Sequence, residues 1–600
     1  MKPNSIAAVL AAAGILTTGT LAVGNSRAER AAFDPLFADG ASAACTAANA
    51  GRPPLLDRLV LAQAETAPFK PAHQQRVATP DDTPPLYTDL GKLHVPITTR
   101  DPRAQAYFDQ GMRLLFSFNH AEAARAFRAA QKLDRHCAMC YWGEALVLGP
   151  NINAPMFPDA VTPAYNAARK ASAKASHASA MEQALIRAVA LRYQAAPPAD
   201  RAPLDQAYAN AMGDAAKAFP NDDTVQVLFA ESLMDLSPWD YWEAGGAKSK
   251  GRSGEMVDAL ERVLERSPTH PGAVHYYIHA MEASSHPDKA LPYARQLAAQ
   301  IPGAGHIVHM PSHIYYRVGL YKDALQANVD AIAIDEKYFK EQHSDPIYKG
   351  AYYPHNIHFV MVSALMGGDG KVALEAASKL DKAVPPEMLK AVGALQPVKA
   401  APYFSQVQFS SPDTLIALPD PGDDFVLVKA MWHYARATGY ARKGALAEAQ
   451  QQLDALDAIA GKGDFKPLTD WGIPAQGIVA TARAVAAARL ADASGDLPGA
   501  IKSYRDAVAL QDELPYTEPP YWYYPVRQSL GAALLRAGQL DEAEAVFRAS
   551  FAKTPSNGWA LRGLMEVYKQ RGDKAALAAA QKRFDTTWLG KKGGPELSSL

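Results

Sequence analysis

The chain has 600 residues, a formal net charge of −1 and 48% hydrophobic residues. A net charge so close to zero gives no electrostatic footprint for nucleic acid or an anionic membrane surface, so we expect neither as a partner. Apolar residues recur at helical rather than alternating spacing, and Gly and Pro cluster between the periodic segments. This pattern predicts an all-α protein.

Residues 1–28 have the features of an export signal. Lys2 precedes an apolar run from Ile6 to Val23, and Ser26-Arg27-Ala28 offers a small-x-small cleavage site. The alternative is a retained membrane anchor, because the run is barely long enough to span a bilayer. Its glycines and threonines favour cleavage. We therefore expect a mature chain that begins near Glu29, is periplasmic or secreted, and has no membrane span.

Residues 29–96 are rich in Pro, Ala and Asp and lack a helical period, which predicts a mostly disordered tether. Repeats follow, and we divide them into an N-terminal set at 97–400 and a C-terminal set at 401–588. The step from Ala290 to Ala324 is 34 residues, the period of tetratricopeptide repeats. Longer steps elsewhere indicate insertions between helices. The predicted architecture is an α-solenoid of helical hairpins, in which each repeat buries its apolar face against its neighbours.

Cys137 and Cys140 form a C-x-x-C pair in the N-terminal repeats. His136 and Met139 lie beside the two thiols, and this soft ligand set suits Cu(I). A local disulfide is the alternative in an oxidising compartment. The sequence leaves both open: a disulfide or a second metal site.

Histidines concentrate in the middle of the chain. Ten of the sixteen lie between positions 270 and 358, and several repeat the same offset from the alanine that opens the second helix of a hairpin. His275, His309 and His358 each stand fifteen residues before Ala290, Ala324 and Ala373. Residues three, four or seven apart lie on one helix face. One face therefore carries His275 and His279, a second carries His306, His309 and His313, and a third carries His355 and His358. The candidate metal ligands are His275, His279, His306, His309, His313, His355 and His358.

Imidazoles that converge from helices are typical of zinc or copper sites, and we cannot choose between these metals from the sequence. His309 and His313, with His275 or His279, form the expected core, whereas His355 and His358 either bind or orient. Glu282, Glu231 and Asp235 are carboxylates that could complete the site, and we expect Glu282 or a tyrosine hydroxyl to fix the ring tautomers.

Several strings of the chain are longer and more specific than helix stacking requires. They begin at His136-Cys137-Ala138-Met139-Cys140-Tyr141-Trp142, Gly149-Pro150-Asn151-Ile152-Asn153, Pro238-Trp239-Asp240, His309-Met310-Pro311-Ser312-His313, Tyr353-Pro354-His355-Asn356 and Glu518-Pro519-Pro520-Tyr521-Trp522-Tyr523-Tyr524-Pro525. With these strings the chain resembles exported bacterial tetratricopeptide-repeat proteins, a largely uncharacterised family, over about residues 90 to 575. The resemblance implies the α-solenoid fold, no established activity, and a concave surface lined by the first helix of each hairpin, where the histidines lie.

Two functions remain open. The first is an exported scaffold whose concave groove takes a protein or peptide partner and carries the histidines, with a transition metal bound or not. The second is a metal-dependent enzyme, with zinc or copper, built on the solenoid. The sequence has no phosphate-cradling loop, no G-x-S-x-G and no H-E-x-x-H, which disfavours the familiar nucleotide-dependent and hydrolase classes. Histidines spread along a groove would favour the first function, and histidines converging on a point the second.

Overall fold

The computed structural model describes residues 83–198, 200–243, 245–341 and 348–600, so the expected signal and most of the expected tether lie outside the described residues. Within these ranges every regular element is a helix, apart from two isolated β-bridges. The prediction of an all-α fold is therefore confirmed. No helix in the described ranges is long and apolar enough to cross a membrane.

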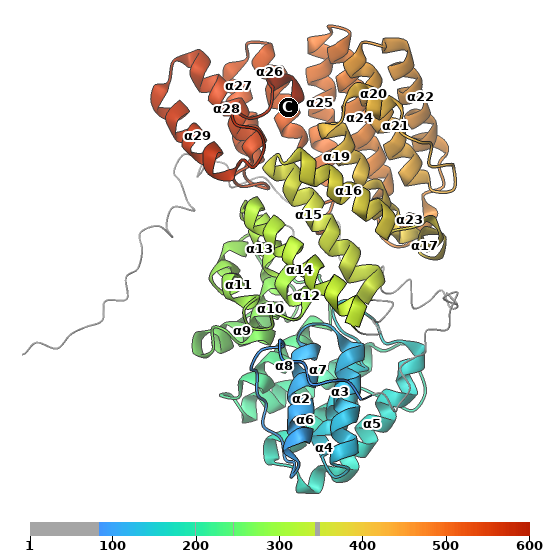
Figure 1. The fold of residues 1–600 in the computed structure, drawn as a ribbon, viewed down its shortest axis with the longest axis vertical. Helices are drawn as coiled ribbons and strands as arrows, with labels where there is room; N and C mark the ends of the chain where they lie inside the picture. The colour runs from blue at the N-terminus through green and yellow to red at the C-terminus, as the bar shows by residue number, and fades with distance from the viewer. Residues whose placement is uncertain (1–82, 199, 244, 342–347) are drawn as a thin grey trace, which may run out of the picture. The chain divides into compact units, whose positions relative to one another are not determined.

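Helices follow one another along the chain as antiparallel hairpins (Figure 1). The helices up to residue 383 are α2 (Pro102–Leu115), α3 (His120–Leu133), α4 (Ala138–Val147), α5 (Val161–Lys174), α6 (Ala180–Leu191), α7 (Ala202–Ala218), α8 (Asp223–Met234), α9 (Ser253–Arg266), α10 (Pro271–Met281), α11 (Leu291–Leu297), α12 (Gly305–His309), α13 (Pro311–Arg317), α14 (Tyr321–Glu341), α15 (Tyr353–Gly367) and α16 (Gly370–Ala383). A π-helical turn, η6 (Tyr348–Tyr352), leads directly into α15.

The remaining helices begin with four short ones and continue as long hairpins. They are α17 (Pro386–Ala391), α18 (Gln396–Ala400), α19 (Pro402–Phe409), α20 (Pro412–Ile416), α21 (Val426–Lys443), α22 (Leu446–Lys462), α23 (Lys466–Thr469), α24 (Ala475–Ala493), α25 (Leu497–Glu513), α26 (Val526–Arg536), α27 (Leu540–Ser550), α28 (Gly558–Arg571) and α29 (Lys574–Thr587). The hairpin partners α21 and α22, α24 and α25, α26 and α27, and α28 and α29 pack against each other.

Small residues allow these helices to approach closely. A phenylalanine on the second helix of a hairpin packs against two glycines. One glycine lies on the first helix of the same hairpin and the other on the first helix of the next, and a β-carbon at either glycine would clash with the ring. This happens at two places far apart in the chain with the same sequence spacing: Phe127 between Gly111 and Gly143, and Phe547 between Gly531 and Gly563. The repeated contact is the stacking unit that a solenoid requires.

Residues 83–96 differ from the expected tether. This irregular segment packs along α2: Tyr107 donates a hydrogen bond to the Pro84 carbonyl (3.0 Å), and the Val95 amide donates to Asp109 (2.9 Å). Leu90 and Val95 are buried. Because these backbone groups find partners on α2 and two apolar side chains leave water, the segment is part of the folded unit.

Candidate metal centre

Helix α10 presents two histidines to the protein interior. His270 caps the helix by accepting a hydrogen bond from the Ala273 amide (3.2 Å), and Pro271 occupies the first turn, where no amide is needed. Every residue of α10 is buried. His275 and His279, one turn apart, point to the same space, with 3.0 Å between their Nε2 atoms.

Helices α12 and α13 bring three further histidines to that space. Met310 separates α12 from α13, and Pro311, which has no amide to donate, opens α13, so the segment consists of two short helices. At its start His306 places Nε2 3.1 Å from Nε2 of His275. The ligand atoms of three histidines lie within 4.8 Å of one another. We call this group the first triad: His275, His279 and His306.

A second triad lies beside the first. Nε2 of His309 is 2.6 Å from Nε2 of His313, and α15 adds His355, whose ligand atom completes a group within 4.8 Å. The π-helical turn η6 precedes His355, and such turns are frequent at functional sites. The second triad is therefore His309, His313 and His355.

Hydrogen bonds fix the tautomers of His275 and His279 in the first triad. Nδ1 of His275 faces the Phe116 carbonyl at 2.7 Å, and Nδ1 of His279 faces Glu282 Oε1 at 3.0 Å. Carbonyl and carboxylate oxygens only accept, so both Nδ1 atoms carry the proton and both Nε2 atoms present a lone pair. Two lone pairs then face each other at 3.0 Å, an arrangement that a cation between them would stabilise.

The second triad repeats this arrangement. Asn328 donates its own amide to the Ala324 carbonyl (2.7 Å), which leaves its Oδ1 to accept from His309 Nδ1 at 2.5 Å. Nδ1 of His313 donates to Glu282 Oε2 (2.9 Å) and to Glu518. The Nε2 atoms of His309 and His313 are consequently both lone-pair donors, and they meet at 2.6 Å. Such outward hydrogen bonds are how proteins orient metal-binding histidines.

A proton is a poor candidate for a cation between these nitrogen pairs. All seven predicted histidines are at most 7% exposed. Burial lowers the pKa of His275, His279 and His313 to about 3, and it lowers the pKa of His306, His309 and His355 well below the usual value. At neutral pH the rings are neutral, which is the form that binds zinc or copper.

Glu282 joins the two triads. One of its oxygens accepts from His279 and the other from His313, and Tyr516 donates to the second oxygen at 3.2 Å. Burial raises the pKa of Glu282, and the hydrogen bond from His279 opposes that rise. Glu282 therefore lies against the Nδ1 atoms of both His279 and His313, the position that the expected role of fixing ring tautomers requires.

Glu518 is a site residue that sequence reasoning did not single out. It comes from the segment before α26, more than 200 residues after His313, and contacts Nδ1 of that ring. Glu518 also lies within 4.8 Å of His279 and Glu282 through its ligand atom. Its only signal in the sequence was the string of prolines and aromatics that follows it, which helix stacking does not require.

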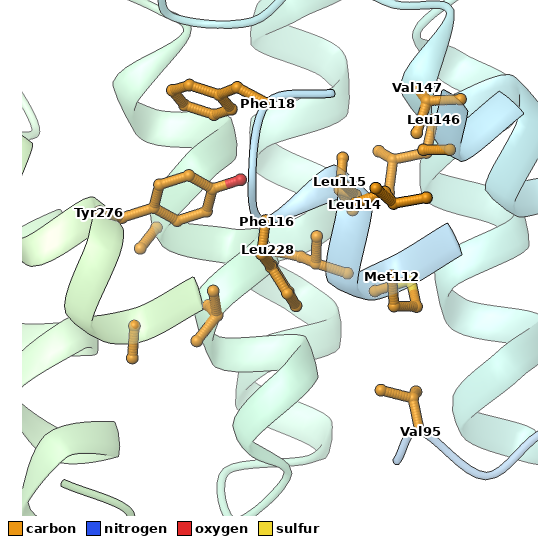
Figure 2. Close-up of a cluster of buried hydrophobic side chains, with 14 of the residues drawn as sticks. Val95, Met112, Leu114, Leu115, Phe116, Phe118, Leu146, Val147, Leu228 and Tyr276 are labelled. Carbon is orange, nitrogen blue, oxygen red and sulfur yellow. The ribbon is translucent and has the colours of Figure 1, made fainter. Parts of the chain in front are cut away.

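Two strained aromatic residues cover the first triad. Phe118 and Trp239 have positive backbone φ angles of 54° and 65°, which residues other than glycine rarely adopt. The Phe118 ring lies 4.5 Å from His275 and 5.2 Å from His306, and the Trp239 ring lies 4.7 Å from His279. Figure 2 shows Phe116 and Phe118 on the turn after α2, beside Tyr276 of α10. Backbone strain of this kind clusters at functional sites.

Other strings that the sequence analysis quoted also reach the centre. Trp239 donates to the Ile152 carbonyl (2.9 Å), and Asn153 donates to the Tyr352 hydroxyl (3.0 Å). The Tyr352 ring lies 4.9 Å from the ring of His306. These loop residues therefore position the aromatic walls of the first triad.

The remaining sequence candidates lie outside the triads. Nε2 of His358 lies 2.8 Å from the Tyr523 hydroxyl. Asp235 forms an ion pair with buried Arg192. Burial raises the pKa of Glu231, and the charge of Arg192 opposes that rise. The expected core also differs: His309 and His313 group with His355 and not with His275 or His279. His306, at the start of this segment, groups with the two histidines of α10, whereas His309 and His313 group with His355 of α15.

Cys137 and Cys140 form a disulfide, with 2.06 Å between the sulfur atoms, at the start of α4. The Cys137 side chain also caps this helix by accepting from the Cys140 amide. Because the two sulfur atoms are bonded to each other, this pair offers no thiolate to a metal ion.

A small cavity borders the second triad. Its volume is about 20 Å³, and roughly 10–15 Å³ is enough for one water molecule. Its lining includes His355, His358, Glu518, Tyr521 and Tyr523. The second triad thus adjoins a space suited to a molecule of water's size.

Comparison with known proteins finds only distant likeness. No family model matches the chain, and no curated protein matches it. Among solved structures, a human IFIT1 dimer with m7Gppp-AAAA is 11% identical, covers 89% of this chain and 93% of its own, and has a TM-score of 0.29. Naa15/Naa10 bound to HypK-THB is 11% identical over 82% of this chain and 90% of its own, with a TM-score of 0.22. Likeness this weak carries no argument about function.

Proposed function

We propose that this protein binds two transition-metal ions, zinc or copper, in the interior of its helical scaffold. The first ion is held by the first triad and the second by the second triad. The observation that carries the proposal is the close approach of Nε2 atoms, 3.0 Å in the first triad and 2.6 Å in the second. The Nδ1 atoms of these rings face oxygen acceptors of Phe116, Glu282, Asn328 and Glu518, which places the ring protons on Nδ1. Without a cation each facing pair is repulsive, and burial prevents water from relieving it.

Burial also separates this proposal from a peptide groove. Histidines that recognise a peptide must reach it, whereas these side chains are at most 7% exposed. A protein or peptide partner on another surface of the scaffold stays a prediction. Three ligands per ion leave a coordination position for a small molecule, which is the feature of catalytic rather than structural sites. Metal-dependent catalysis is therefore the second candidate function, favoured by the cavity beside His355.

We further propose that the chain is exported, because the apolar leader from Ile6 to Val23 has the pattern of a signal peptide. Mass spectrometry of the mature chain from the native host tests this. An N-terminus near Glu29 in the periplasmic or secreted fraction is the expected result, and an intact leader in the membrane fraction would reject it.

Metal content is the direct test of the main proposal. Full-length protein is stripped with a chelator, and zinc and Cu(I) are titrated separately while bound metal is counted by elemental analysis. Two equivalents are expected. The double variant His309→Ala/His313→Ala should bind one fewer with its helical circular dichroism intact. His433→Ala is the matched control, because this half-buried ring pairs with Gln452 (2.9 Å) in the C-terminal repeats. A wild-type protein that binds no metal refutes the proposal.

A further inference from the structure

A second cavity lies among the C-terminal repeats. Helices α19, α21, α24 and α26 contribute to its lining, together with the segment before α26. Its volume is about 10 Å³, close to the roughly 10–15 Å³ that one water-sized particle requires. Among the described residues that line it, Arg489 alone carries a charge and none is acidic. The cavity is therefore small and has a guanidinium in its wall.

Two buried N–H groups of this lining have no acceptor. One is Nε of Arg489 and the other is Nε1 of Trp522, and neither has a hydrogen-bond partner among the described residues. Trp522 is only 4% exposed, and its ring packs 4.9 Å from that of Phe404 and 5.5 Å from that of Tyr434. Because buried donors in native proteins are almost always satisfied, these two indicate a ligand that accepts hydrogen bonds.

Positive charge beside the cavity is not balanced by carboxylates. Asp492, nearly one turn beyond Arg489 on α24, forms an ion pair with Arg536 at 2.9 Å. A second guanidinium, that of Arg442 on α21, donates to two backbone carbonyls at 3.2 and 3.1 Å. Burial lowers the pKa of Arg442, and the positive charge of Arg489 lowers it further. Two guanidiniums are thus close enough to affect each other, and the carboxylate beside them is already paired.

Charge and size together select the ligand. A water molecule would accept from both N–H groups but would leave the excess positive charge in place. Phosphate, sulfate and organic carboxylates carry negative charge, but they need more space than one water-sized particle occupies. Two neutral residues of the lining, Gln408 and Tyr524, direct their donors to the Ser599 carbonyl at 2.9 and 3.2 Å. A monatomic anion that accepts from Arg489 and Trp522 meets both requirements.

A short non-helical segment separates this cavity from the one beside His355. Tyr521 and Tyr523 line the cavity beside His355, whereas Trp522 and Tyr524 line the second cavity. Alternate side chains of one segment therefore form a wall of each cavity. No residue of either triad lines the second cavity, so its ligand is distinct from the metal ions proposed above.

We propose that this cavity binds one halide ion, chloride under ordinary conditions. Arg489 supplies the positive charge, and Trp522 supplies a second N–H donor from the opposite element of the lining. An ion that binds the folded chain and not the unfolded chain raises the stability of the fold in proportion to the logarithm of its concentration. The site therefore makes the stability of the C-terminal repeats depend on halide.

Stability of full-length protein tests the site. Thermal unfolding is followed by circular dichroism while sodium chloride replaces sodium gluconate at constant ionic strength, because gluconate is too large for the cavity. A midpoint that rises with chloride concentration is expected. Arg489→Met should raise the chloride concentration needed for a given rise by roughly tenfold or more, because a charged hydrogen bond is lost. Trp522→Phe keeps the ring, loses the N–H and should raise it by a smaller factor.

Arg483→Met is the matched control. Arg483 also lies on α24, but it forms an ion pair with Asp457 and does not line the cavity. This variant should respond to chloride as the wild type does. Broadening of the chlorine NMR signal by the protein measures binding directly, and Arg489→Met should abolish the broadening while bromide should compete for it.

Two results would overturn the proposal. One is an equal response of the midpoint to chloride and to gluconate in the wild type. The other is an unchanged chloride response and unchanged broadening in Arg489→Met. If Arg489→Met does not fold, Trp522→Phe decides in its place, and a response identical to the wild type rejects the site. Metal titration is unaffected by any of these results, so the two-metal function stands or fails separately.

Discussion

Replacing Glu282 with glutamine should weaken metal binding at both triads at once. The carboxylate accepts from His279 of the first triad and from His313 of the second. Glutamine has nearly the same shape, but it offers one accepting oxygen and one donating amide. One histidine therefore keeps its partner, and the other meets a donor and must move its proton to Nε2, which removes the lone pair that binds metal.

The magnitude follows from what such partners contribute elsewhere. Loss of an outer partner of a metal-binding histidine costs roughly 10- to 100-fold in affinity, or about 1.4–2.8 kcal/mol. We expect that loss at one site and a smaller one at the other. Asn328→Leu is the comparison variant, because Asn328 supports only His309 and so only the second triad. Competition titration against a metal indicator resolves the two equivalents.

Two results would refute this reasoning. If Glu282→Gln binds both equivalents with wild-type affinity, the carboxylate does not orient the ligands. If Asn328→Leu weakens both equivalents equally, the two triads are not separate sites. Circular dichroism at equal concentration confirms that each variant remains folded.

Three further predictions follow. His355→Ala should remove one metal equivalent of two, whereas His358→Ala should keep both, as elemental analysis will report; equal losses would contradict the grouping of the triads. Gly111→Ala should destabilise the protein by about 1–3 kcal/mol in urea unfolding, because a β-carbon there would lie 2.5 Å from the ring of Phe127. Gly461→Ala is the control and should not destabilise it, because no atom lies within 4 Å of a β-carbon at that position. Equal urea midpoints for the two variants would argue against close helix packing at Gly111. Burial lowers the pKa of His270 from 6.5 to about 4, so the unfolded chain binds more protons between these values and stability falls as pH drops through that window. The His270 contribution amounts to roughly 3 kcal/mol. His270→Asn keeps a cap acceptor and should reduce the slope of unfolding free energy against pH in metal-free protein, and an unchanged slope would refute the assignment.

The helical architecture was predictable because its signal is local and repeated. The period from Ala290 to Ala324 and the glycines opposite Phe127 report helix packing that each repeat forms with its neighbour. The histidine register was predictable for the same reason, since spacing within a helix decides which rings share a face. These features need no knowledge of distant contacts.

The partition of the histidines and the role of Glu518 were not predictable in this way. His306 groups with the histidines of α10, and His309 and His313 group with His355 of α15, so the division depends on which neighbouring helix lies beside each turn of the segment. Spacing within one segment does not report that. Glu518 arrives from a segment between hairpins, where no periodicity constrains its position. The depth of burial was missed as well, because a concave wall was expected and the loops carrying Trp239 and Phe118 cover it.

The spread of the site over successive hairpins has a consequence for how the molecule unfolds. In a solenoid each repeat contacts only its neighbours, so regions can open independently and end repeats fray first. Here α10, α12 with α13, and α15 all contribute histidines to the two triads, and Glu518 contacts His313 from a segment beyond α25. A bound metal pair would fuse these repeats into one cooperative block. Amide hydrogen exchange across the block would then slow together on metal loading, while α28 and α29 would exchange as before.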